Sequence, residues 1–209
     1  MKKILILFVS ISLALFLTAC SDSESSNSKS NDEKETSQEN KEEAKQEETK
    51  KEESNEKVTE SEVGKLTVVN QKKDLNQTVQ SGPINLTINA IQTATLEPSE
   101  SYKEMFDGKD KVTIVTINLS VENTSDDTIG FYPDQGVLTT NTGEQANAEM
   151  FMSDEVGGDF YGKVKKEGNV IFQVNSEAKE INQLKYIIDG AHDADFNSLG
   201  DQLQIDLSF

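Results

Sequence analysis

The chain contains no arginine and no tryptophan, and its 38 acidic residues against 20 lysines leave a formal net charge of −18. An acidic surface repels the phosphate backbone of nucleic acids, whose binding depends on positive side chains. Arginine is also the side chain that reads guanine and phosphate through paired hydrogen bonds. We therefore expect no nucleic acid among the partners of this protein.

Histidine and cysteine occur once each, at His192 and Cys20. A Ser-His-Asp or Cys-His catalytic site needs a histidine base, and the second also needs a free thiol. A single cysteine excludes a disulfide within the chain. We interpret His192 as a polar residue at the start of a short surface helix, assign no catalytic residue, and expect a protein that is not an enzyme. Catalysis by paired carboxylates remains the enzymatic alternative.

What the chain does have begins at its N-terminus, where residues 1–19 show the three parts of a secretory signal peptide. Lys2 and Lys3 precede an apolar run from Ile4 to Leu17, and small residues follow. The segment from Leu17 to Cys20 resembles the lipobox of bacterial lipoproteins, which implies cleavage before Cys20 and a diacylglycerol on its sulfur. We expect this lipid to hold the protein to the membrane, on the outer face of the cell, because two acyl chains anchor stably.

Residues 20–63 follow with a very different composition, rich in Glu, Lys, Ser and Asn and nearly free of apolar side chains. Such a segment cannot bury enough apolar surface to offset the entropy lost on ordering. We predict that residues 20–63 form a disordered acidic tether that carries the lipidated Cys20 at its start.

Residues 64–209 carry the signals of a β-domain. Apolar and polar residues alternate repeatedly, and clusters of Asn, Asp, Gly and Pro separate the alternating runs. The expected strands are 66–69, 84–96, 112–121, 136–140, 145–151, 170–174, 183–189 and 202–209. We predict short helices only at 98–106 and 191–199, the second capped by Gly200. Many short strands with one apolar face favour two packed sheets.

The strand at 112–121 has the clearest pattern. Val115, Ile117, Leu119 and Val121 alternate with polar residues, so we expect them to face one buried side of a central strand. Upstream, Val112 and Ile114 fall on the opposite face. The first half of the strand is therefore buried on both sides or carries a bulge.

Three acidic clusters are the candidates for calcium, which prefers oxygen ligands from loops. They are Asp126 with Asp127, Asp154 and Glu155 with Asp159, and Asp193 with Asp195. None has the spacing of an EF-hand, and we interpret them as solvated loops. We therefore assign no metal site and no cofactor.

The stretch from Met150 to Gly162 gathers two methionines and three aromatic residues around a Gly-Gly pair. Such residues can present an adaptable apolar contact surface. The alternative that we favour is that Phe151 and Phe160 end two strands and belong to the core.

Two segments resemble a Gram-positive lipoprotein family with an Ig-like β-sandwich and no assigned function: the strand and Asn-x-Ser turn of residues 112–125, and the Gly turn and strand of residues 166–174. The resemblance covers roughly residues 82–190. It implies an Ig-like two-sheet β-sandwich, which we assign to residues 64–209, although the usual cysteine pair and tryptophan are absent. Our functional hypothesis is a surface-anchored lipoprotein whose domain is a non-enzymatic interaction module for an unknown protein or envelope partner. The alternative is a lipoprotein that binds a small ligand or calcium through its acidic loops.

Overall fold

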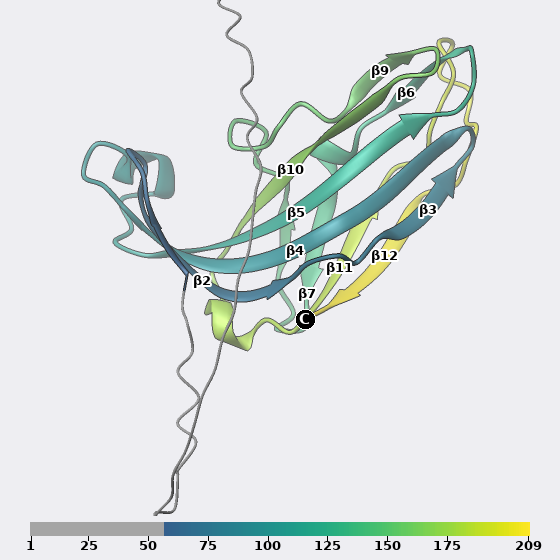
Figure 1. Cartoon of the computed structure of the whole chain (residues 1–209). Coiled ribbons are helices and arrows are strands. Elements are labelled where there is room, and N and C mark those ends of the chain that lie inside the picture. Colours follow the sequence, from purple (N-terminus) through teal and green to yellow (C-terminus); the bar gives the residue numbers. More distant parts are fainter. Residues whose placement is uncertain (1–56) are drawn as a thin grey trace, which may run out of the picture. The chain divides into compact units, whose positions relative to one another are not determined.

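Two long neighbouring strands, β4 (Ile84–Pro98) and β5 (Val112–Asn123), form the centre of the larger sheet (Figure 1). The computed structural model describes residues 57–209, which lie within one compact unit. The predicted signal segment, Cys20 and the tether as far as residue 56 lie outside the described residues. The described chain is all-β, as predicted, with three antiparallel sheets and three short 3-10 turns.

The strands divide among the three sheets as follows. The six-stranded sheet adds to β4 and β5 the strands β1 (Val58–Glu60), β2 (Gly64–Lys72), β3 (Gln77–Ser81) and β10 (Lys165–Val174). The four-stranded sheet contains β7 (Val137–Thr140), β8 (Gln145–Asn147), β11 (Gln183–Ile188) and β12 (Leu203–Ser208). A ribbon of β6 (Thr128–Phe131) and β9 (Gly158–Tyr161) completes the set. The 3-10 turns are η1 (Lys103–Phe106), η2 (Pro133–Gln135) and η3 (Ala178–Glu180).

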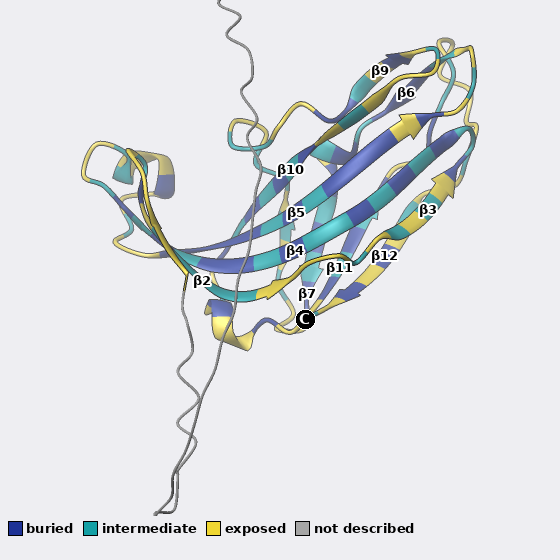
Figure 2. Cartoon of the chain, viewed as in Figure 1, coloured by how far each residue is buried: buried dark blue, intermediate teal, exposed yellow. Residues whose placement is uncertain are grey.

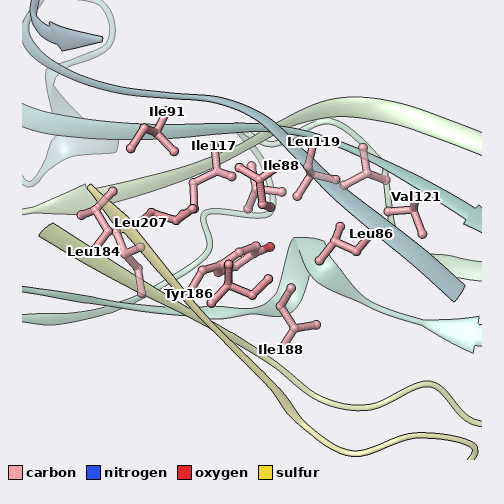
Figure 3. Close-up of a cluster of buried hydrophobic side chains, with 14 of the residues drawn as sticks. Leu86, Ile88, Ile91, Ile117, Leu119, Val121, Leu184, Tyr186, Ile188 and Leu207 are labelled. Carbon is pink, nitrogen blue, oxygen red and sulfur yellow. The ribbon is translucent and has the colours of Figure 1, made fainter. Parts of the chain in front are cut away.

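One apolar core lies between the six-stranded and four-stranded sheets. In Figure 3 the side chains of Ile117, Leu119 and Val121 point toward Tyr186 and Leu207 of the facing sheet, and all five belong to one buried cluster. Val115 joins this cluster too, so the predicted register of β5 is confirmed. The core face follows directly from the alternation in the sequence.

The first half of β5 is buried on both faces, which was one of the two alternatives. Val112 and Ile114 pack with Leu96 and Phe106 in a second, smaller cluster. Phe106 is the last residue of η1, within the segment that joins β4 to β5. This connection therefore covers the outer face of the sheet at one end.

A bulge in β4 sets which of its residues face the core. Pairing with β5 shifts between Ile88 and Ala90, so Asn89 is an extra residue. Side chains alternate along a strand, and an extra residue inverts the alternation beyond it. Ile88 and Ile91 both reach the core for this reason, and burial alternates along the part of β4 from Ile84 to Ile88 (Figure 2).

Several expectations differ from the structure, and β3, β6 and β9 are strands that the sequence did not predict. Residues 191–199 do not form a helix, because His192 bridges Gly130 and Ser198 and the Asp193 carboxylate binds nearby backbone N–H groups instead. Of residues 98–106, only the last turn is helical, as η1. The sheet also begins earlier than residue 64, because β1 pairs with β2 through Thr59 opposite Leu66.

No helix within residues 57–209 has the length and apolar character that crossing a bilayer requires.

The carboxylate of Glu144, between β7 and β8, holds the end of β10. One oxygen accepts the backbone N–H and side-chain amide of Asn175 at 2.6 and 2.7 Å, and the other accepts the N–H and hydroxyl of Ser176 at 2.9 and 2.8 Å. Burial raises the pKa of Glu144, but these hydrogen bonds outweigh it and bring the net pKa below the ordinary 4.5.

Ile117→Ala should lower the free energy of unfolding by about 2–5 kcal/mol, because it leaves a cavity in the main core. Thr116→Ala, one residue away on the opposite face of β5, is the matched control and should cost less than about 1 kcal/mol. Urea unfolding followed by circular dichroism measures both. Equal midpoints for Ile117→Ala and the native chain would contradict the register of β5.

Glu144→Gln should destabilise the chain by about 1–3 kcal/mol at neutral pH, since it removes hydrogen bonds to a charged acceptor. The folded pKa lies below the unfolded one, so the contribution is complete above the unfolded pKa and disappears as pH falls through the folded pKa. The difference in the free energy of unfolding between Glu144→Gln and the native chain should thus become smaller on acidification. Urea midpoints between neutral pH and pH 3 test this, with Glu122→Gln on the exposed surface of β5 as control. A stability difference that does not change with pH would argue against a stabilising role of the ionised Glu144 carboxylate.

Candidate binding surface

The β6–β9 ribbon has one buried and one outward face. Ile129, Phe131 and Phe160 point inward and are fully or almost fully buried. Their neighbours Gly130 and Tyr132 lie on the outward face of the first strand, and Asp159 and Tyr161 lie on that of the second, because side chains alternate along each strand. Asp159 and Tyr161 are exposed, so their side chains are the part of this ribbon that a partner can reach.

Gly130 lets the chain around His192 dock onto this outward face. The backbones of Gly130 and His192 exchange two hydrogen bonds, at 2.9 and 3.0 Å. A Cβ atom at position 130 would lie 2.1 Å from Cε1 of the His192 ring, so any side chain would collide with the imidazole. A glycine within a strand marks such close approaches.

The His192 ring sits between two other aromatic rings. Its centroid is 5.9 Å from that of Tyr132, with 21° between the planes, and 4.9 Å from that of Phe196, with 28° between the planes. Phe196 is 79% exposed. We call Tyr132, Tyr161, His192 and Phe196 the aromatic face. Offset stacking of this kind contributes beyond simple burial.

The loop that carries Phe196 is held by the carboxylate of Asp193. One oxygen accepts the N–H groups of Asp195 and Asn197 at 2.9 and 2.8 Å, and the other accepts the side-chain amide of Asn197 at 2.9 Å. The Asn197 side chain, followed by its backbone N–H, holds the pKa of Asp193 below its usual value. Phe196 itself has a φ of 62°, which is unfavourable for a bulky side chain. The hydrogen bonds of Asp193 thus offset local backbone strain.

A hollow of about 390 Å³ adjoins the aromatic face, with Tyr132 as a shared wall. Asp134, Met150 and Gly157 also line it. Burial raises the pKa of Asp134, and its Oδ1 atom is buried without a hydrogen-bond partner among the described residues. Lys166 donates to the carbonyl of Gly157, which lines the hollow, and its Nζ lies 4.7 Å from the centroid of the Phe160 ring.

The stretch from Met150 to Gly162 was interpreted either as an apolar contact surface or as strand ends that belong to the core, and each interpretation holds for part of it. Phe160 is fully buried, as predicted, whereas Phe151 is 101% exposed and the prediction that it belongs to the core is wrong. The reason is that β8 ends at Asn147, four residues earlier than expected. Met150 and Tyr161 are exposed as well, so this stretch does present an apolar surface.

The three acidic clusters stay apart, and two of their carboxylates are engaged within loops. Asp154 accepts the N–H and side-chain amide of Asn169, and Asp193 holds its own loop. Asp126 pairs with Lys163 at 3.2 Å. Across residues 57–209, no three His, Cys, Asp or Glu side chains come close enough together to hold a metal ion.

Sequence reasoning missed the aromatic face, because its members are separated by up to 64 positions along the chain, from Tyr132 to Phe196. His192 was predicted to start a surface helix and instead forms the centre of the stack. The one available signal was Gly130, a glycine between two apolar residues of a short strand.

Fold and surface together define a class: an all-β domain with two facing antiparallel sheets and an exposed aromatic face. The chain belongs to the family described as "Domain of unknown function (DUF4352)", whose sequence profile matches residues 73–195. This confirms the resemblance, drawn from residues 112–125 and 166–174, to a lipoprotein family without an assigned function.

Two relatives come from Bacillus subtilis strain 168. The SPbeta prophage-derived uncharacterized lipoprotein YonS is 27% identical over 134 residues, which is 63% of this chain and 60% of YonS. The uncharacterized protein YdhF is 27% identical over 116 residues, or 53% of this chain and 48% of YdhF. The chain thus spans less than two thirds of the length of either relative.

Among solved structures, a functionally unknown protein from Listeria monocytogenes EGD-e superposes with a TM-score of 0.53 at 14% identity. The match covers 70% of this chain and 88% of that protein. At this identity the likeness concerns the fold alone.

Proposed function

We propose that the protein is a surface lipoprotein, anchored by a lipid on Cys20, whose Ig-like β-sandwich is a non-enzymatic interaction module at the cell envelope. The aromatic face of Tyr132, Tyr161, His192 and Phe196 is the observation that carries this proposal. It contacts a protein partner of basic character.

The lipid anchor is supported by the segment from Leu17 to Cys20 and by the description of YonS as a lipoprotein. Lipidation leaves the exported domain outside the cell, within reach of envelope proteins. The Ig-like description is supported by two facing antiparallel sheets with a shared core.

The aromatic face suits a protein partner for two physical reasons. Tyrosine and other aromatic residues are enriched where interfaces are strongest, because they bury much area and lose few rotamers. The loop of Phe196 is already ordered by Asp193, so binding does not have to supply the ordering entropy.

The acidic residues around the aromatic face indicate the charge of the partner. Asp159 lies beside Tyr161, whose hydroxyl donates to it at 3.4 Å, and Asp193 and Asp195 flank the Phe196 loop. A basic partner complements these carboxylates and accelerates the encounter. The alternative of calcium binding has less support, because the Asp154 and Asp193 carboxylates already accept backbone N–H groups.

Phe196→Ser should weaken partner binding by roughly 30-fold or more, as expected for a residue at the centre of an interface. Photo-activated cross-linking from position 161, on intact cells, captures the partner, and the purified pair then gives the affinities. Phe151→Ser is the matched control: the same change at a fully exposed phenylalanine outside the stack, expected to bind within about twofold.

An equal loss of partner affinity in Phe196→Ser and Phe151→Ser, or unchanged affinity in Phe196→Ser, would show that the aromatic face does not bind the partner. Turnover of peptidoglycan, ester or peptide substrates, abolished by one Asp or Glu substitution with the fold intact, would replace the interaction module with an enzyme.

Cys20→Ala should release the protein from the membrane or leave residues 1–19 uncleaved, because the acyl chains attach to this sulfur. Detergent phase partitioning and mass spectrometry of the mature N-terminus measure the effect. Ser21→Ala, next to the cleavage site, serves as control and should stay membrane-bound. A mature N-terminus other than Cys20 would disprove the anchor.

A further inference from the structure

A cleft of about 590 Å³ opens at the end of the large sheet where β5 begins and β10 ends. Thr113 lies opposite Val174 in this pair of strands, and both line the cleft. The volume falls within the range of small-molecule sites, about 300–1,000 Å³. β10 leads from the cleft to the β6–β9 ribbon, and its ten residues span about 30 Å. The cleft is therefore separate from the aromatic face.

The walls of the cleft are fixed by hydrogen bonds, as in a preformed site. In β2, Val69 is a bulged residue between Val68 and Asn70, and it faces the cleft. The Asn70 side chain donates to the carbonyls of Ala178 and Ile181 at 3.1 and 3.2 Å, which ties η3 to the sheet. Thr93 donates to the same Ala178 carbonyl.

The opposite wall is equally restrained. Asn175 lines the cleft, and its backbone and side chain are both held by Glu144. Both walls are thus ordered by Asn70, Thr93 and Glu144, whose side chains lie outside the lining.

The lining is basic, in contrast to the chain as a whole. Lys109, Lys111 and Lys179 all line the cleft, and Glu177 is the one carboxylate among the lining residues. The chain as a whole has a formal net charge of −18. Three ammonium groups around one concavity concentrate the attraction for an anion, because concave walls of low dielectric focus the field.

The present partners of these lysines are weak competitors. Lys111 contacts Glu97 at 2.9 Å and Lys179 contacts Glu177 at 2.6 Å, both between exposed side chains. Lys109 donates to the neutral amide of Asn175 at 3.2 Å and lies 3.9 Å from Asp107. Exposed ion pairs contribute little, so an incoming anion can replace these partners at low cost.

The floor of the cleft is apolar. Val174 and Ala178 are buried residues of its lining, and Val69 adds a second branched side chain. A ligand that carries both charge and an apolar part therefore fits better than a bare ion.

We propose that this cleft binds a small organic anion. The lysines hold its phosphate or carboxylate group, and its apolar part lies on the valine floor. The hydroxyls of Thr95 and Thr113 are neutral polar groups of the lining that can add hydrogen bonds. This inference is independent of the proposed protein partner.

The test uses residues 20–209 with Cys20→Ser, labelled with nitrogen-15 and titrated with phenyl phosphate, butyrate and inorganic phosphate. We expect saturable shifts of the amides of Thr113, Asn175 and Lys179 with an organic probe. The double variant Lys109→Gln/Lys111→Gln should lose about tenfold or more in affinity. The matched control is Lys185→Gln, which removes a lysine paired with Asp206 on the other sheet and should bind normally.

The two organic probes distinguish the sources of the anion, since the tighter of them identifies phosphate or carboxylate as the preferred group. Absence of saturable shifts in the cleft, or an equal loss in Lys185→Gln, would overturn the proposal. Inorganic phosphate binding as tightly as phenyl phosphate and butyrate would leave no role for the valine floor and would overturn the organic ligand. Phe196→Ser should bind the probes normally, because the two sites are independent.

Discussion

The pairing of β4 with β5 is the constraint on which the rest of this molecule depends. It runs from Ile84 opposite Asn123 to Leu96 opposite Val112, with one interruption at the bulge. Its inner face supplies the apolar side chains that the four-stranded sheet covers. Its outer face carries polar residues that connect neighbouring strands. Both candidate sites lie at the margins of this central pair, and each is positioned by bonds that lead back to it.

The bulged residue Asn89 also begins a row of side-chain hydrogen bonds that connects neighbouring strands. Its side-chain amide donates to Asn118 at 3.1 Å, and Asn118 donates to Asn169 at 3.0 Å. Asn169 in turn donates to Asp154 at 3.1 Å. This row of amides crosses β4, β5 and β10 and ends in the loop that borders the hollow next to the aromatic face. Linked hydrogen bonds of this kind order a loop more firmly than a single contact does.

Sequence reasoning predicted what depends on local alternation and failed where distant segments meet. Val115 to Val121 were placed correctly, because a strand with one buried face leaves a period of two in the sequence. Residues 191–199 were predicted to be helical, yet pairing with Gly130 overrides their local preference. Phe151 and Phe160 were both predicted to end strands. β8 stops at Asn147 and leaves Phe151 exposed, whereas Phe160 is buried on the inward face of β9.

The candidate sites illustrate the same limit. Neither the stack of Tyr132, His192 and Phe196 nor the group of Lys109, Lys111 and Lys179 has a periodic spacing. Each site is brought together by the pairing of distant strands, so no short sequence motif predicts it. The predicted lipobox around Cys20 is the opposite case, since four consecutive residues are enough to suggest it.

The strained backbone at Phe196 is the strongest argument that the aromatic face serves a purpose. A bulky residue in the left-handed region is unfavourable, and an exposed phenylalanine gains little burial in return. Asparagine or glycine would relieve the strain at this position without disturbing the bonds of Asp193. Three hydrogen bonds to Asp193 instead hold the loop in a conformation that exposes the apolar ring of Phe196 to solvent, stacked on His192. Stability alone gives no reason for that arrangement, whereas burial of the ring against a partner does.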